Sequence, residues 1–253
     1  MSKLVPKDFQ VTEVPDVLGR MCRQYFETGR NAPLQLELDN GVVMDDWPVS
    51  HYVDSTEMRR LEREFLRHAH GRVLDVGCGT GRVGLVLREK GKYVVGVDRS
   101  PDMIYICRER GLVAVQMDVN QQVPEGPFDA AVLYTNGFGM VGSIENVRTL
   151  LRRLGGVMPR GGLVIAESND PDRMSHQIDI EYQKKNLELG RYVGQRVWRV
   201  RSGDLVEPWS QWVQVEPALM EKIAGETGWS VSAGPEYEEG SHWGAYFFCL
   251  RRK

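Results

Sequence analysis

The feature that most constrains the fold of this chain is a glycine-rich turn between an apolar run and a helical pattern. The segment reads Val73-Leu74-Asp75-Val76-Gly77-Cys78-Gly79-Thr80-Gly81-Arg82. Glycines let the backbone turn tightly and let a ligand approach closely, since no Cβ stands in the way. The first N–H groups of the following helix have no partner within the helix and point toward such a ligand. The motif therefore predicts a strand, a ligand-binding turn and a helix, although the same glycines would also suit an ordinary turn.

The glycine spacing separates two classes of ligand. A dinucleotide-binding turn has the spacing Gly-x-Gly-x-x-Gly. Gly77 and Gly79 fit this spacing, but Arg82 occupies the third position and the last glycine comes one residue early, at Gly81. The Asp75 carboxylate before the turn would repel a pyrophosphate and would suit a ligand with an ammonium group. The turn therefore favours S-adenosylmethionine over a dinucleotide.

Residues 71–168 alternate between short apolar runs and helical patterns, which indicates a parallel sheet covered on both faces. The expected strands are 72–76, 93–97, 114–117, 130–134 and 163–167, and the expected helices are 81–90, 101–110 and 143–157. Two closing strands are expected near 230–233 and 245–251, after a helix at 216–227. The predicted fold is α/β, a doubly wound, mostly parallel seven-stranded sheet with helices on both faces.

The two remaining parts of the chain predict additions to this core. We expect residues 1–70 to form an N-terminal helical lid, with helices at 15–27 and 55–70 and short strands or loop around Asn40-Gly41. The domain at 71–253 would carry an insertion at about 169–215, with a helix at 172–189 and an antiparallel pair at 191–200 and 209–215. Both additions would cover the carboxyl ends of the strands.

A second strand supplies a carboxylate for the same ligand. Val94-Val95-Gly96-Val97-Asp98 ends in Asp98, and a carboxylate at a strand tip can accept hydrogen bonds from both hydroxyls of a ribose. Ser100 and Pro101 follow as the cap and the first turn of the next helix. Asp98 could instead serve only as a helix-capping residue.

These motifs together resemble those of class I S-adenosylmethionine-dependent methyltransferases, in a bacterial small-molecule branch. The resemblance covers about residues 71–168. It implies that S-adenosylmethionine is the cofactor, that the turn lies along its methionine part, and that Asp98 holds the ribose. It further implies that Asp118, at the end of Gln116-Met117-Asp118-Val119, binds the adenine amino group between residues that flank the ring. Asp118 could equally be a turn former. The predicted cofactor-binding residues are Asp75, Gly77, Cys78, Gly79, Gly81, Asp98, Arg99, Met103, Met117, Asp118, Val119, Tyr134 and Asn136.

Residues after the fourth and fifth strands are candidates for the transfer site. Ligands of this architecture collect at the carboxyl ends of the strands, so Tyr134 to Asn136 should line the site, unless Asn136-Gly137 only makes a turn. No catalytic residue is identified, and Glu167, His51 and His242 are weak candidates for a base. An apolar acceptor pocket could be built from Trp47, Tyr52, Trp209 and Trp212, although these aromatic residues could also be core.

Composition excludes several classes of protein. The formal net charge of -3 lacks the basic excess of a nucleic-acid binder. No apolar run approaches the roughly 18 residues that span a bilayer, and the N-terminus has no signal-peptide pattern. The four cysteines are scattered and predict reduced thiols rather than a metal site. We expect a cytoplasmic protein with a small-molecule acceptor, no nucleic-acid or membrane partner and no metal.

The expected activity is methyl transfer to a small molecule by in-line displacement, with the protein acting mainly by positioning and desolvation. The chain lacks the Asn/Asp-Pro-Pro-aromatic pattern of enzymes that methylate amino groups of nucleic-acid bases and protein side chains. Two alternatives stay open. One is a non-catalytic S-adenosylmethionine-binding scaffold, and the other is a nicotinamide-dependent dehydrogenase, which Asp75 and the glycine spacing disfavour.

Overall fold

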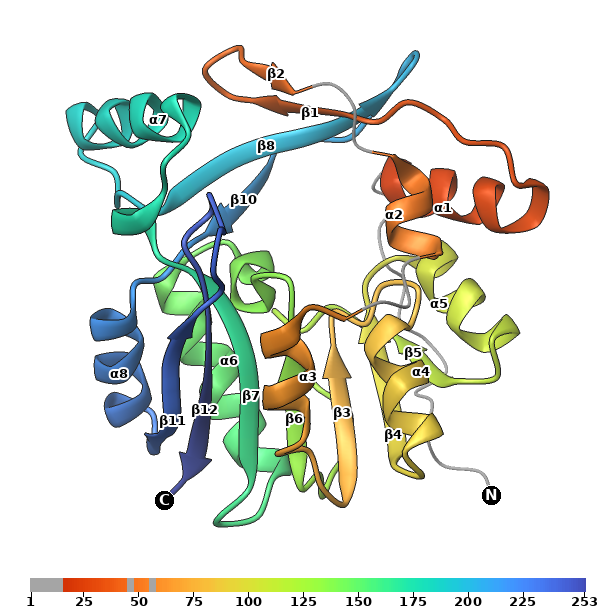
Figure 1. Ribbon diagram of the computed structural model, residues 1–253, viewed down its shortest axis with the longest axis vertical. Coiled ribbons are helices and arrows are strands. Elements are labelled where there is room, and N and C mark those ends of the chain that lie inside the picture. Colours follow the sequence, from red (N-terminus) through yellow and green to blue (C-terminus); the bar gives the residue numbers. More distant parts are fainter. Residues whose placement is uncertain (1–15, 45–47, 55–57) are drawn as a thin grey trace.

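A seven-stranded sheet organises the computed structural model, which describes residues 16–44, 48–54 and 58–253 (Figure 1). Its strand order is β11-β12-β7-β6-β3-β4-β5. The parallel strands are β3 (Arg72–Val76), β4 (Tyr93–Asp98), β5 (Val113–Gln116), β6 (Ala130–Leu133) and β7 (Leu163–Asn169). The strands β11 (Trp229–Tyr237) and β12 (Ala245–Arg252) complete the sheet in antiparallel pairing. The predicted fold class is confirmed.

Helices cover both faces of this sheet because its strands present apolar side chains to both. On β6, Ala130 and Val132 belong to a hydrophobic cluster with α3 (Arg60–Leu66) and α4 (Arg82–Glu89). Ala131 and Leu133 belong to a second cluster with α6 (Ile144–Val157) and α8 (Pro217–Glu226). The helix α5 (Pro101–Glu109) packs through Ile104 and Cys107 on Cys78 and on Ala114 of β5. This two-sided burial leaves the strand ends as the place for a ligand.

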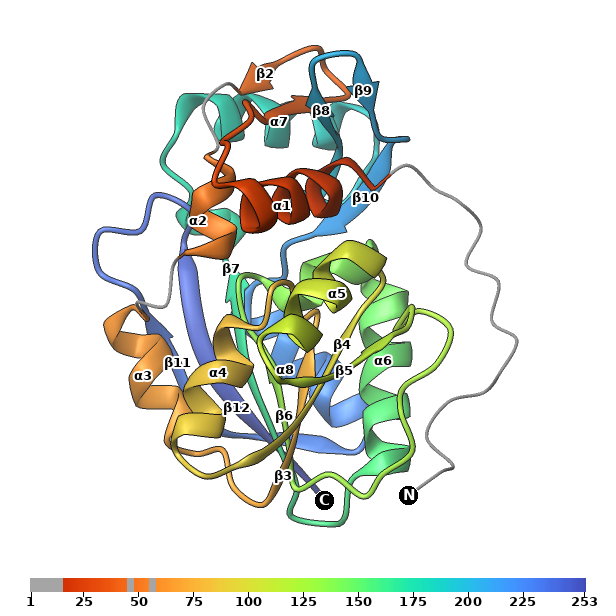
Figure 2. The ribbon, with the colours of Figure 1, turned by 90° about the vertical axis from the view of Figure 1, so that its right-hand side faces the viewer.

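A second, antiparallel sheet lies over the carboxyl ends of the parallel strands (Figures 1 and 2). It contains β1 (Gln35–Leu38), β2 (Val43–Met44), β8 (Gln195–Ser202), β9 (Leu205–Val206) and β10 (Ser210–Val213). The helices α1 (Val17–Thr28), α2 (Val49–Val53) and α7 (Gln177–Glu188) belong to the same layer. We call these eight elements the cap. The N-terminal segment and the insertion therefore share one sheet, in which β1 pairs with β8.

Of the loop or short strands expected around Asn40-Gly41, the structure has the strands, because β1 and β2 pair across this turn. Two expected helices differ in their bounds. The helix expected at 55–70 is limited to α3, and the one expected at 172–189 is split into the short helix η2 (Pro171–Arg173) and α7. His176, which precedes α7, has extended backbone angles, and this separates the two helices. Pro15, Trp47 and Ser55 lie outside the described residues.

The cap is joined to the main sheet where α1 begins, beside the end of β4 (Figure 2). The Glu207 carboxylate accepts hydrogen bonds from the backbone N–H groups of Val17, at 2.8 Å, and Leu18, at 3.0 Å. Asp16 caps the same helix end and accepts a hydrogen bond from the Ser100 hydroxyl at 2.5 Å. Ser100 in turn caps α5. Two carboxylates at one helix N-terminus stabilise it through its unpaired N–H groups.

Replacing Glu207 by alanine should lower the free energy of unfolding by about 1–2 kcal/mol, as for the loss of a helix cap. The reason is that Glu207 is buried and is the partner of two backbone N–H groups of α1. Urea unfolding of both proteins measures the difference. Asp204→Ala is the matched control, since Asp204 is exposed in the same segment. Equal losses in the two variants would contradict the capping role.

No helix among the described residues combines the length and apolar content required to cross a membrane.

Candidate functional site

The glycine turn that follows β3 is shaped for a close ligand. Gly77, Gly79 and Gly81 have φ angles of 70°, 52° and 91°, a region that L-residues with side chains rarely adopt. A Cβ at Gly77 would lie 2.5 Å from the Met140 Cε atom, and one at Gly81 would lie 2.4 Å from Leu112 Cδ1. A Cβ at Gly79 would meet nothing within 4 Å. A side chain at Gly77 or Gly81 would thus require Met140 or Leu112 to move, whereas Gly79 faces open space.

Asp98 lies beside this open space, at the end of β4. Its carboxylate accepts hydrogen bonds from the backbone N–H groups of Gly79 and Ser100, both at 2.9 Å. Burial raises the pKa of the Asp98 carboxyl above its ordinary value, while the two N–H groups oppose that rise. A carboxylate has about four acceptor positions, so Asp98 retains capacity for two further donors such as ribose hydroxyls.

Asp75 and Cys78 lie beneath the turn rather than on its open side. Asp75 is 3% exposed and its Oδ2 atom has no hydrogen-bond partner. Burial raises the pKa of Asp75 to about 7. The Cys78 Sγ atom points inward and lies 3.9 Å from the Cys107 Sγ atom. The cofactor-binding roles of Asp75 and Cys78 stay predictions, and both residues pack the underside of the turn.

Five further predicted cofactor-binding residues are placed in two different environments. Arg99 and Asp118 end neighbouring strands, and the Asp118 carboxylate accepts a hydrogen bond from the backbone N–H of Asn120 at 2.9 Å. Met117 and Val119 are buried in the main core, and Met103 packs between α1 and α5. Arg99 and Asp118 are thus at the strand ends, and the other three side chains are buried.

A cavity of about 390 Å³ opens between the sheet and the cap, and its lining includes Arg99, the residue that follows Asp98 in the sequence. Arg99 and Asn120 form its floor at the ends of β4 and β5, and Trp209 contributes an indole from the cap. The other lining residues are Met140, Val141, Gly142, Asn146, Glu207, Pro208, Ser210 and Gln211. Its volume falls within the range of small-molecule sites, about 300–1,000 Å³.

The turn after β6 is the second unusual backbone feature of the site. Thr135 and Asn136 have φ angles of 57° and 52°, and among the described residues they alone combine a side chain with a positive φ. Such conformations cost about 1–3 kcal/mol each and gather at functional sites. The turn precedes the short helix η1 (Gly137–Val141), whose Met140 side chain packs on Gly77. The β6 turn and the glycine turn are therefore in contact.

The side chains of this turn point in different directions. Tyr134 is buried against Phe247, and its hydroxyl donates a hydrogen bond to the Glu62 backbone carbonyl at 2.8 Å. Asn136 is buried and its side-chain amide donates to the Val213 carbonyl at 3.4 Å. Thr135, between them, is exposed. The side chains of Tyr134 and Asn136 thus form hydrogen bonds within the protein, and their cofactor-binding roles stay predictions.

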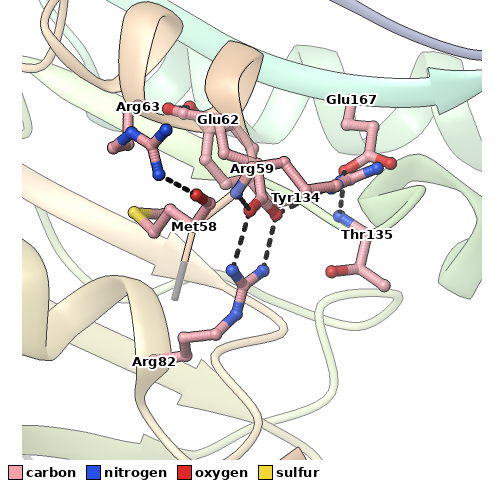
Figure 3. A network of polar contacts seen from close by, with 8 residues as sticks. All are labelled: Met58, Arg59, Glu62, Arg63, Arg82, Tyr134, Thr135 and Glu167. Carbon is pink, nitrogen blue, oxygen red and sulfur yellow. Dashed lines mark hydrogen bonds and ion pairs between the residues drawn. The ribbon is translucent and has the colours of Figure 1, made fainter. Parts of the chain in front are cut away.

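A network of charges lies behind the β6 turn, with two buried carboxylates, Glu62 and Glu167, and an exposed guanidinium, that of Arg59 (Figure 3). Glu167 accepts hydrogen bonds through Oε2 from the Thr135 backbone N–H, at 2.8 Å, and from the Arg59 guanidinium, at 2.5 Å. Arg59 also contacts Glu62 at 3.2 Å, and Arg82 binds both oxygens of Glu62, at 2.6 and 2.9 Å. Burial raises the pKa of Glu167 against the opposing effect of Arg59. Burial alone would raise the pKa of Glu62, but Arg82 and Arg59 hold it below its ordinary value.

The two histidine candidates are exposed and lie on different elements. His51 is on α2, and His242, in the loop between β11 and β12, is within 3.2 Å of the Ser175 hydroxyl. Of the predicted aromatic pocket, Trp209 lines the cavity. Trp212 instead packs on Gly139 and on Trp198, at a ring-centroid distance of 5.1 Å. Tyr52 is half-buried beside the glycine turn, where its carbonyl accepts a hydrogen bond from Thr80.

Sequence reasoning missed Met140 and the partners of Glu167. Arg82 carried a signal, because it stands where a dinucleotide-binding turn has glycine, and a guanidinium there needs a partner. Arg59 and Glu62 carried none, since an acidic and a basic residue three apart on an amphipathic helix usually form a solvated pair.

Comparison with known proteins supplies independent information on this site. A family model described as a methyltransferase domain matches residues 50–212. The chain is 28% identical to glycine N-methyltransferase of Homo sapiens over 151 residues, which cover 49% of this chain and 51% of that protein. It is 34% identical to trans-aconitate 2-methyltransferase of Rhodococcus jostii over 110 residues, 42% of either chain. The chain thus spans about half the length of the curated relatives it matches.

One solved structure resembles almost the whole chain. It is a SAM-dependent methyltransferase from Bacteroides fragilis in complex with S-adenosyl-L-homocysteine. The superposition has a TM-score of 0.78 at 23% identity and covers 99% of this chain and 98% of the other. The likeness shows a common fold that includes the cap.

Proposed function

The chain belongs to the methyltransferase-domain family, among the class I S-adenosylmethionine-dependent enzymes, and from this premise we propose that it transfers a methyl group from S-adenosylmethionine to a small-molecule acceptor. The cofactor would lie along the glycine turn, over the carboxyl ends of β3 and β4. The acceptor would enter between these strand ends and the cap.

The observation that carries this proposal is the pairing of open space at Gly79 with the Asp98 carboxylate. A Cβ atom built on Gly79 would meet no atom of the described residues beyond its two chain neighbours within 4 Å. The Gly79 N–H donates a hydrogen bond to the Asp98 carboxylate at 2.9 Å. A nucleoside with free hydroxyls fits this pair, because Asp98 accepts and the glycine offers no steric obstacle. The adjoining cavity begins at Arg99 and gives room for a ring.

When bound, the cofactor would supply a methyl group on a positively charged sulfur, so the protein has to bind, orient and exclude water. Asp98 would fix the ribose, and the Met140 side chain closes the turn above Gly77. Glu207 and Trp209, in the segment between β9 and β10, line the cavity. These residues favour alignment of two ligands, which is the main contribution a protein can make to a displacement of this kind.

A small acceptor is supported by two observations. The cavity of about 390 Å³ lies under the cap, where a folded protein or a nucleic-acid duplex would not fit. Glycine N-methyltransferase and trans-aconitate 2-methyltransferase, to which the chain is similar, are both named for small acceptors.

We expect Asp98→Ala to weaken S-adenosylhomocysteine binding by at least about tenfold, or ~1.4 kcal/mol. The reason is that the substitution removes the carboxylate that would accept hydrogen bonds from the ribose and that accepts one from the Gly79 N–H. Asp98→Asn, which retains one oxygen, should lie between the wild-type protein and the alanine variant. Calorimetric titration measures both affinities. Unchanged affinity in Asp98→Ala would refute the ribose assignment.

A further inference from the structure

The β6 turn holds a threonine in a backbone conformation that threonine does not favour. Thr135 is β-branched, yet it has a left-handed φ angle, as does Asn136, whose residue type adopts this region more readily. Isolated threonine residues avoid this region, so contacts from the rest of the molecule must hold the turn. The turn lies in contact with the glycine turn through Met140. Its position therefore affects the place where the two ligands of the proposed reaction would meet.

Glu167 is the group that holds Thr135. Its Oε2 atom accepts the Thr135 backbone N–H at 2.8 Å, and the carboxylate is 4% exposed. A buried carboxylate of this kind needs a charged partner, and Arg59 provides it at 2.5 Å. The oxygen that binds Thr135 is thus itself fixed by a guanidinium (Figure 3).

The same network reaches the helix that begins at the glycine turn. Arg59 contacts Glu62, and Glu62 is bound through both oxygens by Arg82, the first residue of α4. Gly81 directly precedes Arg82. A continuous series of ion pairs therefore connects the backbone of the β6 turn with the helix that carries the cofactor turn.

We propose that Glu167 is a positioning residue, which fixes the position of the strained β6 turn relative to the glycine turn through Arg59, Glu62 and Arg82. The inference rests on the proposed function, because the relative position of the two turns matters where the methyl donor and the acceptor must be aligned. The Oε2 atom of Glu167, which lies nearest the turn, already binds two donors, and this favours a positioning role over the role of a proton acceptor. Displacements of about 1 Å at such sites reduce rates by about 100-fold.

The first test uses S-adenosylmethionine carrying ¹³C in its methyl group, bound to the full chain, and S-adenosylhomocysteine as the ligand for affinity. In Glu167→Ala we expect the methyl resonance of the bound cofactor to move by more than its line width. The affinity for S-adenosylhomocysteine should stay within about threefold of wild type. Glu167→Gln retains an oxygen for the Thr135 N–H and should restore the resonance toward its wild-type position. A general loss of packing would not be repaired in this way.

The matched control is Glu64→Ala. Glu64 lies on α3, the helix that also carries Glu62, and forms an exposed ion pair with Arg60 at 2.8 Å. Replacing Glu64 by alanine should leave both the methyl resonance and the affinity unchanged. An unmoved methyl resonance in Glu167→Ala, with wild-type binding intact, would overturn the positioning role and leave the proposed function standing. Failure of the wild-type protein to bind S-adenosylhomocysteine would instead refute the proposed function.

A second test needs no ligand. Thr135→Gly removes the strain of the left-handed backbone, because glycine adopts this conformation freely. If Glu167 holds the turn, the loss of stability caused by Glu167→Ala should be smaller in the Thr135→Gly background than in the wild-type background. Urea unfolding of the four proteins measures this coupling. Equal losses in both backgrounds would overturn the inference, whatever the protein binds.

Discussion

Gly79→Val is expected to abolish measurable binding of S-adenosylhomocysteine, with a loss of affinity of at least about 100-fold, or ~2.7 kcal/mol. A valine side chain would occupy the open space above the turn, where no atom of the described residues beyond the two chain neighbours of Gly79 lies within 4 Å of the Cβ position. The φ angle of 52° adds backbone strain for a β-branched residue. Calorimetric titration of the variant with S-adenosylhomocysteine provides the measurement.

Gly91→Val separates the steric effect from the strain. Gly91 also has a positive φ, 72°, and open space at its Cβ position, but it lies after the far end of α4. We expect this control to lose stability and retain wild-type affinity. Normal binding by Gly79→Val, or an equal loss of affinity in the two variants, would show that the space above Gly79 is not where the cofactor lies.

Asp75→Asn is expected to stabilise the protein, and to do so more strongly as the pH rises. Burial raises the pKa of Asp75 from 3.8 to about 7, so the folded protein favours the protonated carboxyl. Its contribution to stability is fully present below about pH 4 and is lost as the pH rises through 7. Asparagine stays neutral throughout. Because a tenfold change in proton affinity is worth about 1.4 kcal/mol, the advantage of the variant should approach a few kcal/mol near pH 8.

Urea unfolding of both proteins at about pH 5 and pH 8 checks this dependence. Asp204→Asn provides the control, because Asp204 is exposed and its change removes no buried charge. A stabilisation by Asp75→Asn that is the same at both pH values would show that Asp75 is not neutral in the folded protein. Asp75 would then be available as a charged group for an ammonium ligand, as the sequence alone suggested.

The fold of residues 71–168 could be predicted because its strands are short apolar runs, most of them buried on both faces, that alternate with helical patterns. The cap could be predicted only in part. The pairing of β1 with β8 joins residues such as Glu37 and Arg199, and no local pattern specifies a contact over such a separation. The antiparallel pairing of β8 with β10 was predicted and is confirmed, because those strands are close in the sequence.

The candidate site was predicted more accurately for the backbone than for the side chains. The turn after β6 is where the strand order places it, but Tyr134 lies two residues after Val132 and therefore faces α3, like Val132 itself. Asp75 shares a face of the sheet with Val73 for the same reason and points toward α4. The period of two along a strand therefore places both side chains on the face of the sheet that α3 and α4 cover. The charged network of Glu167 with Arg59, Glu62 and Arg82 could be identified only from the structure, since it joins segments that are far apart in the sequence.

The central claim is that the strand ends of β3 and β4 bind S-adenosylmethionine, and its most direct test is a calorimetric titration of the wild-type protein with S-adenosylhomocysteine and, separately, with NAD⁺. The account predicts saturable binding of one S-adenosylhomocysteine per chain and none of NAD⁺. Saturable binding of NAD⁺ with no response to S-adenosylhomocysteine would contradict it.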